Sequence, residues 1–219
     1  MKTVKGYWFS DGDFLPHGDN RQMVIGETHH VEGKIIPCAW GLHASRRPID
    51  ALRYARGNII WGVELSGTIV PHKEDKFAAS DRRYLWRLDV YDLLRTFARR
   101  CALDTIHLWN APDVMVRYLK TGDESLKPVA LASVGKEWEV EDCSTPELCA
   151  RNAASATILG RIWEASRFAT MAGVCVDGDT CLAMSFYYNV KATAKCAATM
   201  KQNRRLLSLI SVERKRQGV

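Results

Sequence analysis

The spacing of apolar residues changes near residue 80, and this change limits the folds that the chain can adopt. Before it, β-forming runs such as Val4–Ser10 and Asn58–Leu65 end at glycine-containing turn sequences, which is typical of strands joined by turns. From about Asp81 the apolar residues follow a helical repeat. The sequence therefore predicts an α+β protein with a strand-rich lobe over residues 1–80 and a helical, basic region over residues 81–219.

Local signals place the elements within each lobe. In the first, a short helix is expected over Pro48–Arg56, because proline suits the first helical turn and Gly57 can end the helix. In the second, Thr145 is a good N-cap residue for an alanine-rich helix. The other predicted strands cover residues 23–25, 31–36 and 68–70, and the predicted helices cover residues 101–109, 113–121, 148–172 and 181–213.

The composition is that of a globular protein that carries positive charge. Apolar residues make up 47% and charged residues 26% of the chain, and the net charge is +6. This charge favours an anionic partner, either nucleic acid or an acidic protein surface, and a basic surface without such a role is an equal alternative. No apolar run approaches the roughly 18 residues needed to span a bilayer. The basic N-terminus lacks the apolar segment of a secretory signal, so we expect a cytoplasmic protein.

The spacing of cysteines and histidines argues against a metal centre. The seven cysteines include no C-x-x-C pair, whereas structural zinc sites bring paired ligands about two to four residues apart. His29 and His30 are adjacent, and adjacent side chains on a strand point to opposite faces. We therefore expect no metal, and thiols that stay reduced and mostly buried.

The segment Gly41–Ser45 is the strongest candidate for a functional site. It places His43 and Ser45 where a strand gives way to a helix, and Tyr54 lies farther along that helix. Strand ends of this kind often collect ligands, and a histidine there can donate a hydrogen bond or act in acid–base chemistry. The alternative is that His43 is a structural histidine and that Ser45 only caps the helix.

The same segment resembles the second motif of ADP-ribosyltransferase folds, in which a Gly-x-aromatic-x-Ser/Thr strand end precedes a helix with an Ala-x-x-Tyr-Ala pattern. The resemblance covers about 25 residues. It implies that Ser45 and Tyr54 bind NAD and that His43 stands where the family usually has tyrosine. Glu64, on the strand after the helix, is the best available counterpart of the family's glutamate. The resemblance thus implies a transferase with His43 and Glu64 as catalytic residues.

A broader pattern is similar to an uncharacterised domain family common in bacteriophages and bacteria. Its core is a cysteine followed by Gly-Leu/Phe-His-Ala, here Cys38 and Gly41–Ala44. Some members end in a Gln-Asn-x-Arg-Leu stretch, which Gln202–Leu206 matches. This resemblance implies an accessory protein of a phage or mobile element that interacts with the host cell.

Two basic segments are candidate anion or nucleic-acid sites. Arg82 and Arg83 stand close to aromatic residues in the charged segment 73–84, so they could hold phosphates while a ring stacks on a base. A solvated connection between the lobes is the alternative. Arg204 and Arg205 belong to a basic C-terminal helix, which suits nucleic acid, although its leucines equally suit a packing face.

Two hypotheses follow from these features. In the first, the N-terminal lobe is ADP-ribosyltransferase-like, binds NAD or another nucleotide, and modifies a host macromolecule. In the second, the protein is a non-catalytic basic binder of nucleic acid or of a host defence protein. A pocket in which His43, Tyr54 and a carboxylate converge would favour the first hypothesis. A buried His43 bonded to the backbone would favour the second. Motifs of the common nucleotide-binding folds and of serine hydrolases are missing from the sequence.

Overall fold

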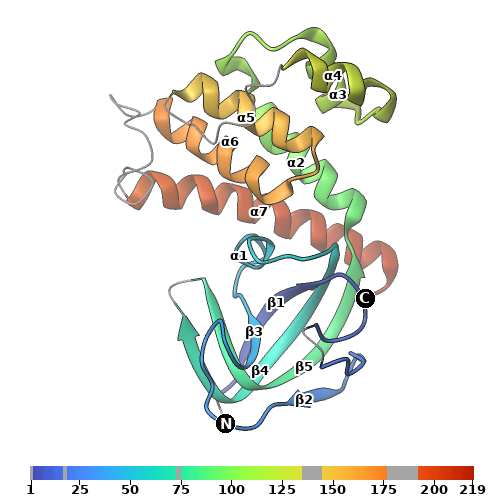
Figure 1. Cartoon of the computed structure of the whole chain (residues 1–219), viewed down its shortest axis with the longest axis vertical. Coiled ribbons are helices and arrows are strands. Elements are labelled where there is room, and N and C mark those ends of the chain that lie inside the picture. Colours follow the sequence, from blue (N-terminus) through green and yellow to red (C-terminus); the bar gives the residue numbers. More distant parts are fainter. Residues whose placement is uncertain (1, 17–18, 73–74, 135–144, 177–191) are drawn as a thin grey trace. The chain divides into compact units, whose positions relative to one another are not determined.

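The computed structural model describes residues 2–16, 19–72, 75–134, 145–176 and 192–219 (Figure 1). The chain forms two compact units. The first unit consists of Met1–Tyr91 together with Leu206–Val219, and the second consists of Asp92–Arg205. An antiparallel sheet builds most of the first unit, and the second is helical, so the predicted α+β class is confirmed. Among the residues described, no helix is long and apolar enough to cross a membrane.

The sheet of the first unit curls until its two ends meet. Its strand order is β1-β4-β5-β2, and β3 also pairs with β5. An isolated bridge then joins Ser45, just after β3, to Tyr7 of β1, with N–H to O distances of 2.8 and 2.9 Å. The path β1-β4-β5-β3 therefore returns to β1, which brings residues distant in sequence around one interior. The strands are β1 (Val4–Ser10), β2 (Thr28–His30), β3 (Leu42–Ala44), β4 (Ile59–His72) and β5 (Lys76–Asp89).

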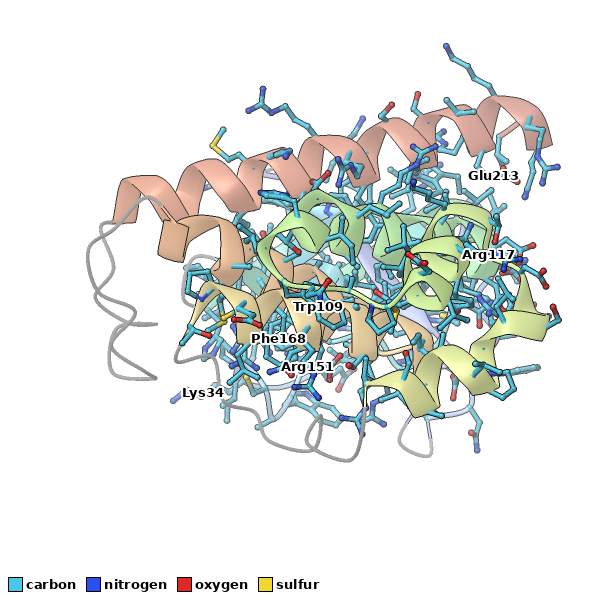
Figure 2. The ribbon with its side chains drawn as sticks, turned by 90° about the horizontal axis from the view of Figure 1, so that it is seen from above. Lys34, Trp109, Arg117, Arg151, Phe168 and Glu213 are labelled. Carbon is cyan, nitrogen blue, oxygen red and sulfur yellow. The ribbon has the colours of Figure 1, made fainter. Side chains whose placement is uncertain are left out.

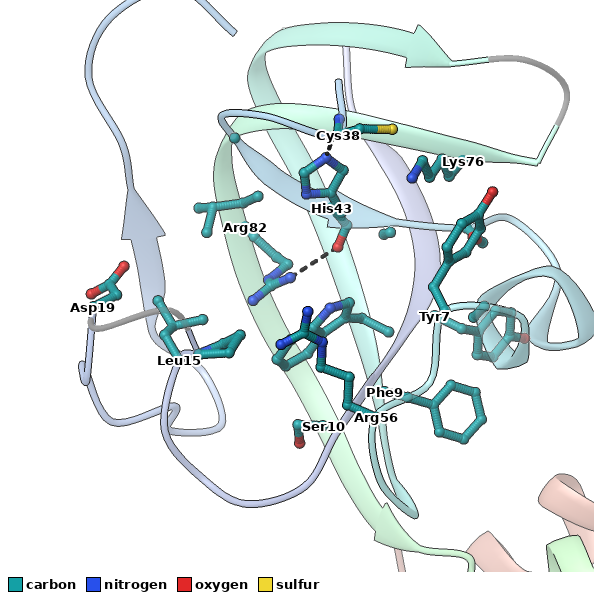
Figure 3. Close-up of a pocket in the computed structure, with 18 of the residues that line it drawn as sticks. Tyr7, Phe9, Ser10, Leu15, Asp19, Cys38, His43, Arg56, Lys76 and Arg82 are labelled. Carbon is teal, nitrogen blue, oxygen red and sulfur yellow. Dashed lines mark hydrogen bonds between the residues drawn. The ribbon is translucent and has the colours of Figure 1, made fainter. Parts of the chain in front are cut away.

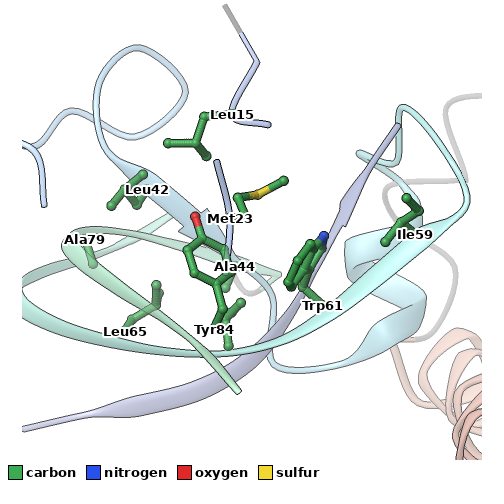
Figure 4. Close-up of a cluster of buried hydrophobic side chains, with 10 residues drawn as sticks. Leu15, Met23, Leu42, Ala44, Ile59, Trp61, Leu65, Ala79 and Tyr84 are labelled. Carbon is green, nitrogen blue, oxygen red and sulfur yellow. The ribbon is translucent and has the colours of Figure 1, made fainter. Parts of the chain in front are cut away.

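A cluster of buried side chains fills one face of this sheet (Figure 4). The rings of Trp61 and Tyr84 meet edge to face, with centroids 5.2 Å apart, and the Trp61 indole donates a hydrogen bond of 2.9 Å to the Ser10 hydroxyl. Leu15 and Met23, from the loop after β1, belong to the same cluster. Burial of these large side chains stabilises the unit by about 1.5–3 kcal/mol for each of them.

The prediction of helical structure from Asp81 onward was wrong for Asp81–Asp89, which belong to β5. A β-bulge explains the wrong prediction. Val63 pairs with Tyr84 but Gly62 pairs with Trp86, so Leu85 is an extra residue on β5. This insertion interrupts the two-residue alternation of buried side chains and imitates a helical spacing. Gly62 is required there, because a Cβ atom at that position would lie 2.0 Å from the Trp86 ring.

Three other features of the first unit also differ from the predictions. Residues 23–25 and 31–36 are not strands, and the strand between them is β2. The backbone of Gly26 and Gly33 takes positive φ angles of 92° and 89°, so each glycine bends the chain away from an extended path. The expected turn at Ser66-Gly67 is instead a register irregularity within the continuous strand β4.

Two helices of the second unit, α3 (Asp113–Thr121) and α5 (Pro146–Ile158), begin close to the predicted residues, whereas α2 (Tyr91–Thr105) begins well before the helix expected over residues 101–109. Thr145 caps α5 as predicted, since its hydroxyl accepts a hydrogen bond of 3.1 Å from the amide of Leu148. The expected single helix over residues 148–172 is divided in two at Gly160, whose φ is 72°. Figure 2 draws the side chains, among them Arg151 of α5 and Phe168 of α6. The α-helices are α1 (Pro48–Leu52) in the first unit, then α2 (Tyr91–Thr105), α3 (Asp113–Thr121), α4 (Lys127–Ser133), α5 (Pro146–Ile158), α6 (Ile162–Val176) and α7 (Ala192–Gln217).

The two remaining predicted helices are placed as follows. Residues 101–109 form the end of α2 and a 3-10 turn, η1 (Ile106–Leu108). The helix expected over residues 181–213 corresponds to α7, and residues 181–191 lie outside the described part of the chain. A second 3-10 turn, η2 (Glu124–Leu126), precedes α4.

Candidate functional site

A cavity of about 820 Å³ lies in the first unit, beside β1, β3 and the loop that precedes β3 (Figure 3). Four of the predicted site residues line it: His43, Ser45, Tyr54 and Arg82. The closure of the sheet through the bridge between Tyr7 and Ser45 explains how they come together. The volume is within the range of about 300–1,000 Å³ that is usual for small-molecule sites.

Arg82 is the most unusual residue of the cavity wall, because it is a cation with only 2% of its surface exposed. It donates hydrogen bonds of 2.9 Å to the carbonyl of His43 and of 3.0 Å to the hydroxyl of Tyr84. Its Nε is buried without a hydrogen-bond partner among the described residues. Burial lowers the pKa of the guanidinium, as expected for a buried charge without a counter-ion.

The guanidinium of Arg82 lies 4.0 Å from the centre of the Trp8 ring, which therefore supports it by a cation–π contact. The charge of Asp19 also acts on Arg82, but its carboxylate is bonded to Arg21 at 2.6 Å. No described carboxylate forms an ion pair with Arg82. The cavity wall thus contains a positive charge that neutral groups hold in place.

His43 is held by the backbone. Its Nε2 accepts a hydrogen bond of 3.1 Å from the amide of Cys38, so that nitrogen carries a lone pair and no proton. Burial and the nearby charges of Lys76 and Arg82 lower the pKa of His43 to about 4. The imidazole is therefore neutral at physiological pH, and the nitrogen that could act as a base is already engaged.

Ser45 and Tyr54 take part in holding the unit together. Ser45 is buried, and its backbone forms the bridge to β1; it does not cap α1, whose N-cap is Arg47. The hydroxyl of Tyr54 donates a hydrogen bond of 2.7 Å to Asp75. Burial and this carboxylate raise the pKa of Tyr54 to about 12. Tyr54 is 40% exposed and lines the cavity, where it can contact a ligand.

Glu64 does not line the cavity that contains His43. It belongs to β4, where Trp61, Val63 and Leu65 all join the buried cluster. Because side chains alternate along a strand, Glu64 points to the opposite face, opposite Lys5 on β1 and Arg83 on β5. The predicted pairing of His43 with Glu64 in one site is therefore not brought about by the fold.

The four basic residues predicted to bind anions have different surroundings. Arg82 is buried, whereas its neighbour Arg83 is exposed and donates a hydrogen bond of 3.2 Å to the carbonyl of Gly26. In the second unit, Arg205 makes two hydrogen bonds of 2.8 and 3.0 Å to Asp104. Arg204, the next residue back, is exposed. Arg82 and Arg83 are neighbours in the sequence, as are Arg204 and Arg205. Neighbouring side chains on a strand or helix point in different directions, so the members of each pair have different surroundings.

The residues that surround His43 could not be identified from the sequence. Lys76 lines the cavity, and its ammonium lies 4.0 Å from the centre of the Tyr54 ring. His72 lies 3.6 Å from the sulfur of Cys38, measured from Nε2. His72 ends β4 and Lys76 begins β5. They reach the cavity because these two strands pair, and the sequence does not specify that pairing. Groups of three or more histidine, cysteine or acidic residues able to hold a metal do not occur in the described residues.

The cavity wall from Tyr7 to Arg82 lies within a conserved domain model. Residues 7–96 match the family described as Domain of unknown function (DUF7666). The similarity to an uncharacterised domain family is thus confirmed for the N-terminal part of the chain. The match begins within β1 and ends within α2, so it includes the sheet from Tyr7 onward and residues 92–96 of the second unit. Comparisons with curated proteins and with solved structures found no significant match.

Proposed function

We propose that the first unit binds a nucleotide, of the ADP or NAD class, in the cavity beside His43. The main support for this proposal is that Arg82 is a buried cation whose described partners are neutral groups. A buried charge costs several kcal/mol unless a counter-charge offsets it. A phosphate bound at the cavity wall, which includes Arg82, would supply that counter-charge.

Aromatic side chains around the cavity suit the rest of a nucleotide. Trp40 is 51% exposed and Tyr54 40% exposed, and both line the cavity. Stacking of a base on such a ring contributes about 1–3 kcal/mol. Lys76 adds a second cation on the same wall. A ligand with a flat base at one end and phosphate at the other would match this distribution of groups.

The geometry supports ligand binding better than it supports ADP-ribosyl transfer. The Nε2 of His43 is occupied by the Cys38 amide, and Glu64 faces away from the cavity. For transfer to a host macromolecule, the carboxylate would come from Asp11, which lines the cavity. We therefore propose nucleotide binding as the function of the first unit. ADP-ribosyl transfer would need a carboxylate other than Glu64.

Calorimetric titration of the full chain with ADP, NAD and adenosine tests the proposal. ADP and NAD should bind, and adenosine should bind at least about tenfold more weakly, because it lacks the phosphate that pairs with Arg82. Equal affinity for ADP and adenosine, or no binding of any of the three, would exclude Arg82 as a phosphate-binding residue.

The alternative proposal is a non-catalytic basic protein that binds nucleic acid or a host protein through α7. The exposed position of Arg204 favours it, whereas Arg205 is already bonded to Asp104. Nucleic-acid binding of this kind should weaken steeply with salt. A gel-shift titration at two salt concentrations, with wild type and Arg204→Gln, tests the alternative separately from the cavity.

A further inference from the structure

Cys38 and His72 form a thiol–imidazole contact at the cavity. The sulfur of Cys38 lies 3.6 Å from Nε2 of His72, which is within hydrogen-bond reach for sulfur. Cys38 comes from the loop before β3, and His72 is the last residue of β4. The thiol is exposed and Cys38 lines the cavity, whereas the other described thiols, Cys101 and Cys149, are buried.

We propose that Cys38 and His72 form a nucleophilic pair that accepts an acyl group from an activated, anionic acyl compound in the cavity. The anionic character of that compound rests on the proposed role of Arg82, but the nucleophilic pair does not. A cysteine is activated when an adjacent imidazole can take its proton. The contact between Cys38 and His72 provides that arrangement.

Cationic side chains line the same cavity as the thiol. Figure 3 shows Cys38 and Lys76 at the same end of the cavity. The cavity wall also includes Arg82, a buried cation that forms no ion pair with a described carboxylate. A reactive sulfur and a group that can hold a substrate therefore line one cavity.

His43 positions the nucleophile rather than activating it. Its ring accepts a hydrogen bond from the amide of Cys38, and its carbonyl accepts one from Arg82. Cys38 has a positive φ of 69°, a conformation that residues other than glycine rarely adopt. The hydrogen bond from its amide to His43 holds this turn, so the thiol is presented to His72 in a fixed direction.

The proposed step is an acyl transfer in which every bond is accounted for. The thiol proton passes to Nε2 of His72 as the sulfur attacks the carbonyl carbon, and a carbon–sulfur bond forms. The bond from that carbon to its leaving group breaks, and the protonated His72 returns the proton to the leaving oxygen or sulfur. The product is a thioester on Cys38, and no change of oxidation state occurs.

The experiment uses the full chain and 4-nitrophenyl acetate, a neutral activated ester. Wild type should release a burst of about one 4-nitrophenolate per chain, and peptide mass spectrometry should find the acetyl group on Cys38. Cys38→Ser should abolish the burst. His72→Gln should slow it by about 100-fold, whereas the exposed histidine variant His30→Gln should react like wild type.

The outcomes separate the pair from the proposed nucleotide site. An acetyl group on other residues, or a burst unchanged in folded His72→Gln, would overturn the nucleophilic pair. Circular dichroism and urea unfolding of each variant establish that it is folded. If ADP occupies the same cavity, saturating ADP should slow acetylation of Cys38. An intact burst that ADP does not slow would support the pair and contradict the shared cavity.

Discussion

The amide of Cys38 donates a hydrogen bond of 3.1 Å to Nε2 of His43, which joins the loop before β3 to the strand itself. This bond determines how the candidate site works. It fixes His43 as a neutral acceptor, and it holds Cys38 in a left-handed conformation beside His72. Since the carbonyl of His43 also accepts a hydrogen bond from Arg82, one residue links the thiol to the buried cation.

Acid should destabilise the protein through His43. The pKa of His43 is lowered to about 4 in the folded protein, against about 6.5 when unfolded. The unfolded chain therefore binds the extra proton first, and stability falls as the pH drops from about 6.5 towards about 4. For this half-buried ring, the loss should be about 2 kcal/mol.

His43→Gln provides the matched comparison for this pH dependence, because its side-chain oxygen can still accept from the Cys38 amide. Urea unfolding of both proteins between about pH 7 and pH 4 gives the difference directly. Wild type should lose more stability on acidification than the variant. Parallel pH profiles would mean that His43 is already protonated or exposed in the folded state.

Replacing Tyr54 by phenylalanine should remove the hydroxyl bonded to Asp75 and keep the ring. The lost hydrogen bond of 2.7 Å should lower the free energy of unfolding by about 1 kcal/mol. In a spectrophotometric titration, the variant should lack the tyrosine that titrates near pH 12 in wild type.

The same position tests whether Tyr54 stacks on a base. If it does, Tyr54→Phe should bind ADP like wild type and Tyr54→Ala should bind ADP more weakly. Equal ADP affinity of all three proteins would exclude stacking.

Gly62→Ala should destabilise the first unit strongly. The new methyl group would lie 2.0 Å from the Trp86 ring across the β-bulge, and relief of such overlap costs about 3 kcal/mol. Gly12→Ala is the control, because nothing lies within 4 Å of a Cβ atom there. Urea unfolding measures both variants, and an equal effect of the two would contradict the bulge and its packing.

Arg205→Gln should destabilise the second unit, and Arg204→Gln should leave its stability within about 0.5 kcal/mol of wild type. Burial opposes ionisation of Asp104, but hydrogen bonds from Arg205 and Lys201 outweigh it and lower the pKa of this carboxyl. Loss of the Arg205 bonds should cost about 2 kcal/mol at neutral pH. This cost should shrink as the pH falls below about 4, where Asp104 becomes protonated in the unfolded chain. Similar effects of both substitutions at neutral pH would contradict the ion pair.

Sequence patterns predicted the α+β class and the starts of α1, α3 and α5 because these depend on local chemistry. Proline in a first turn and the Thr145 cap each act within a few residues. The pattern failed at Leu85, where a bulge that depends on Gly62 and Trp86 of two paired strands shifts the period. The pattern also predicted one alanine-rich helix where Gly160 separates α5 from α6, since alanine and glycine there give similar apolar spacing.

Only the site residues that lie close together in one segment could be predicted from the sequence. His43, Ser45 and Tyr54 were identified because they lie within 12 residues of each other, and they do line one cavity. His72 and Lys76 reach that cavity through strand pairing, which a single sequence does not specify. Glu64 was assigned to the site as the counterpart of a glutamate in the resembled family, but side chains alternate along β4 and Glu64 points to the other face.

The most direct test of the nucleotide site is the affinity for ADP of Arg82→Met compared with Arg83→Met. Methionine fills a similar space without charge, and the Tyr84 hydroxyl keeps its 3.0 Å contact with His29, so the variant should fold. Calorimetric titration should show ADP binding at least about tenfold weaker for Arg82→Met, and unchanged for the exposed Arg83→Met. Wild-type affinity in a folded Arg82→Met protein would contradict a role for Arg82 in binding phosphate.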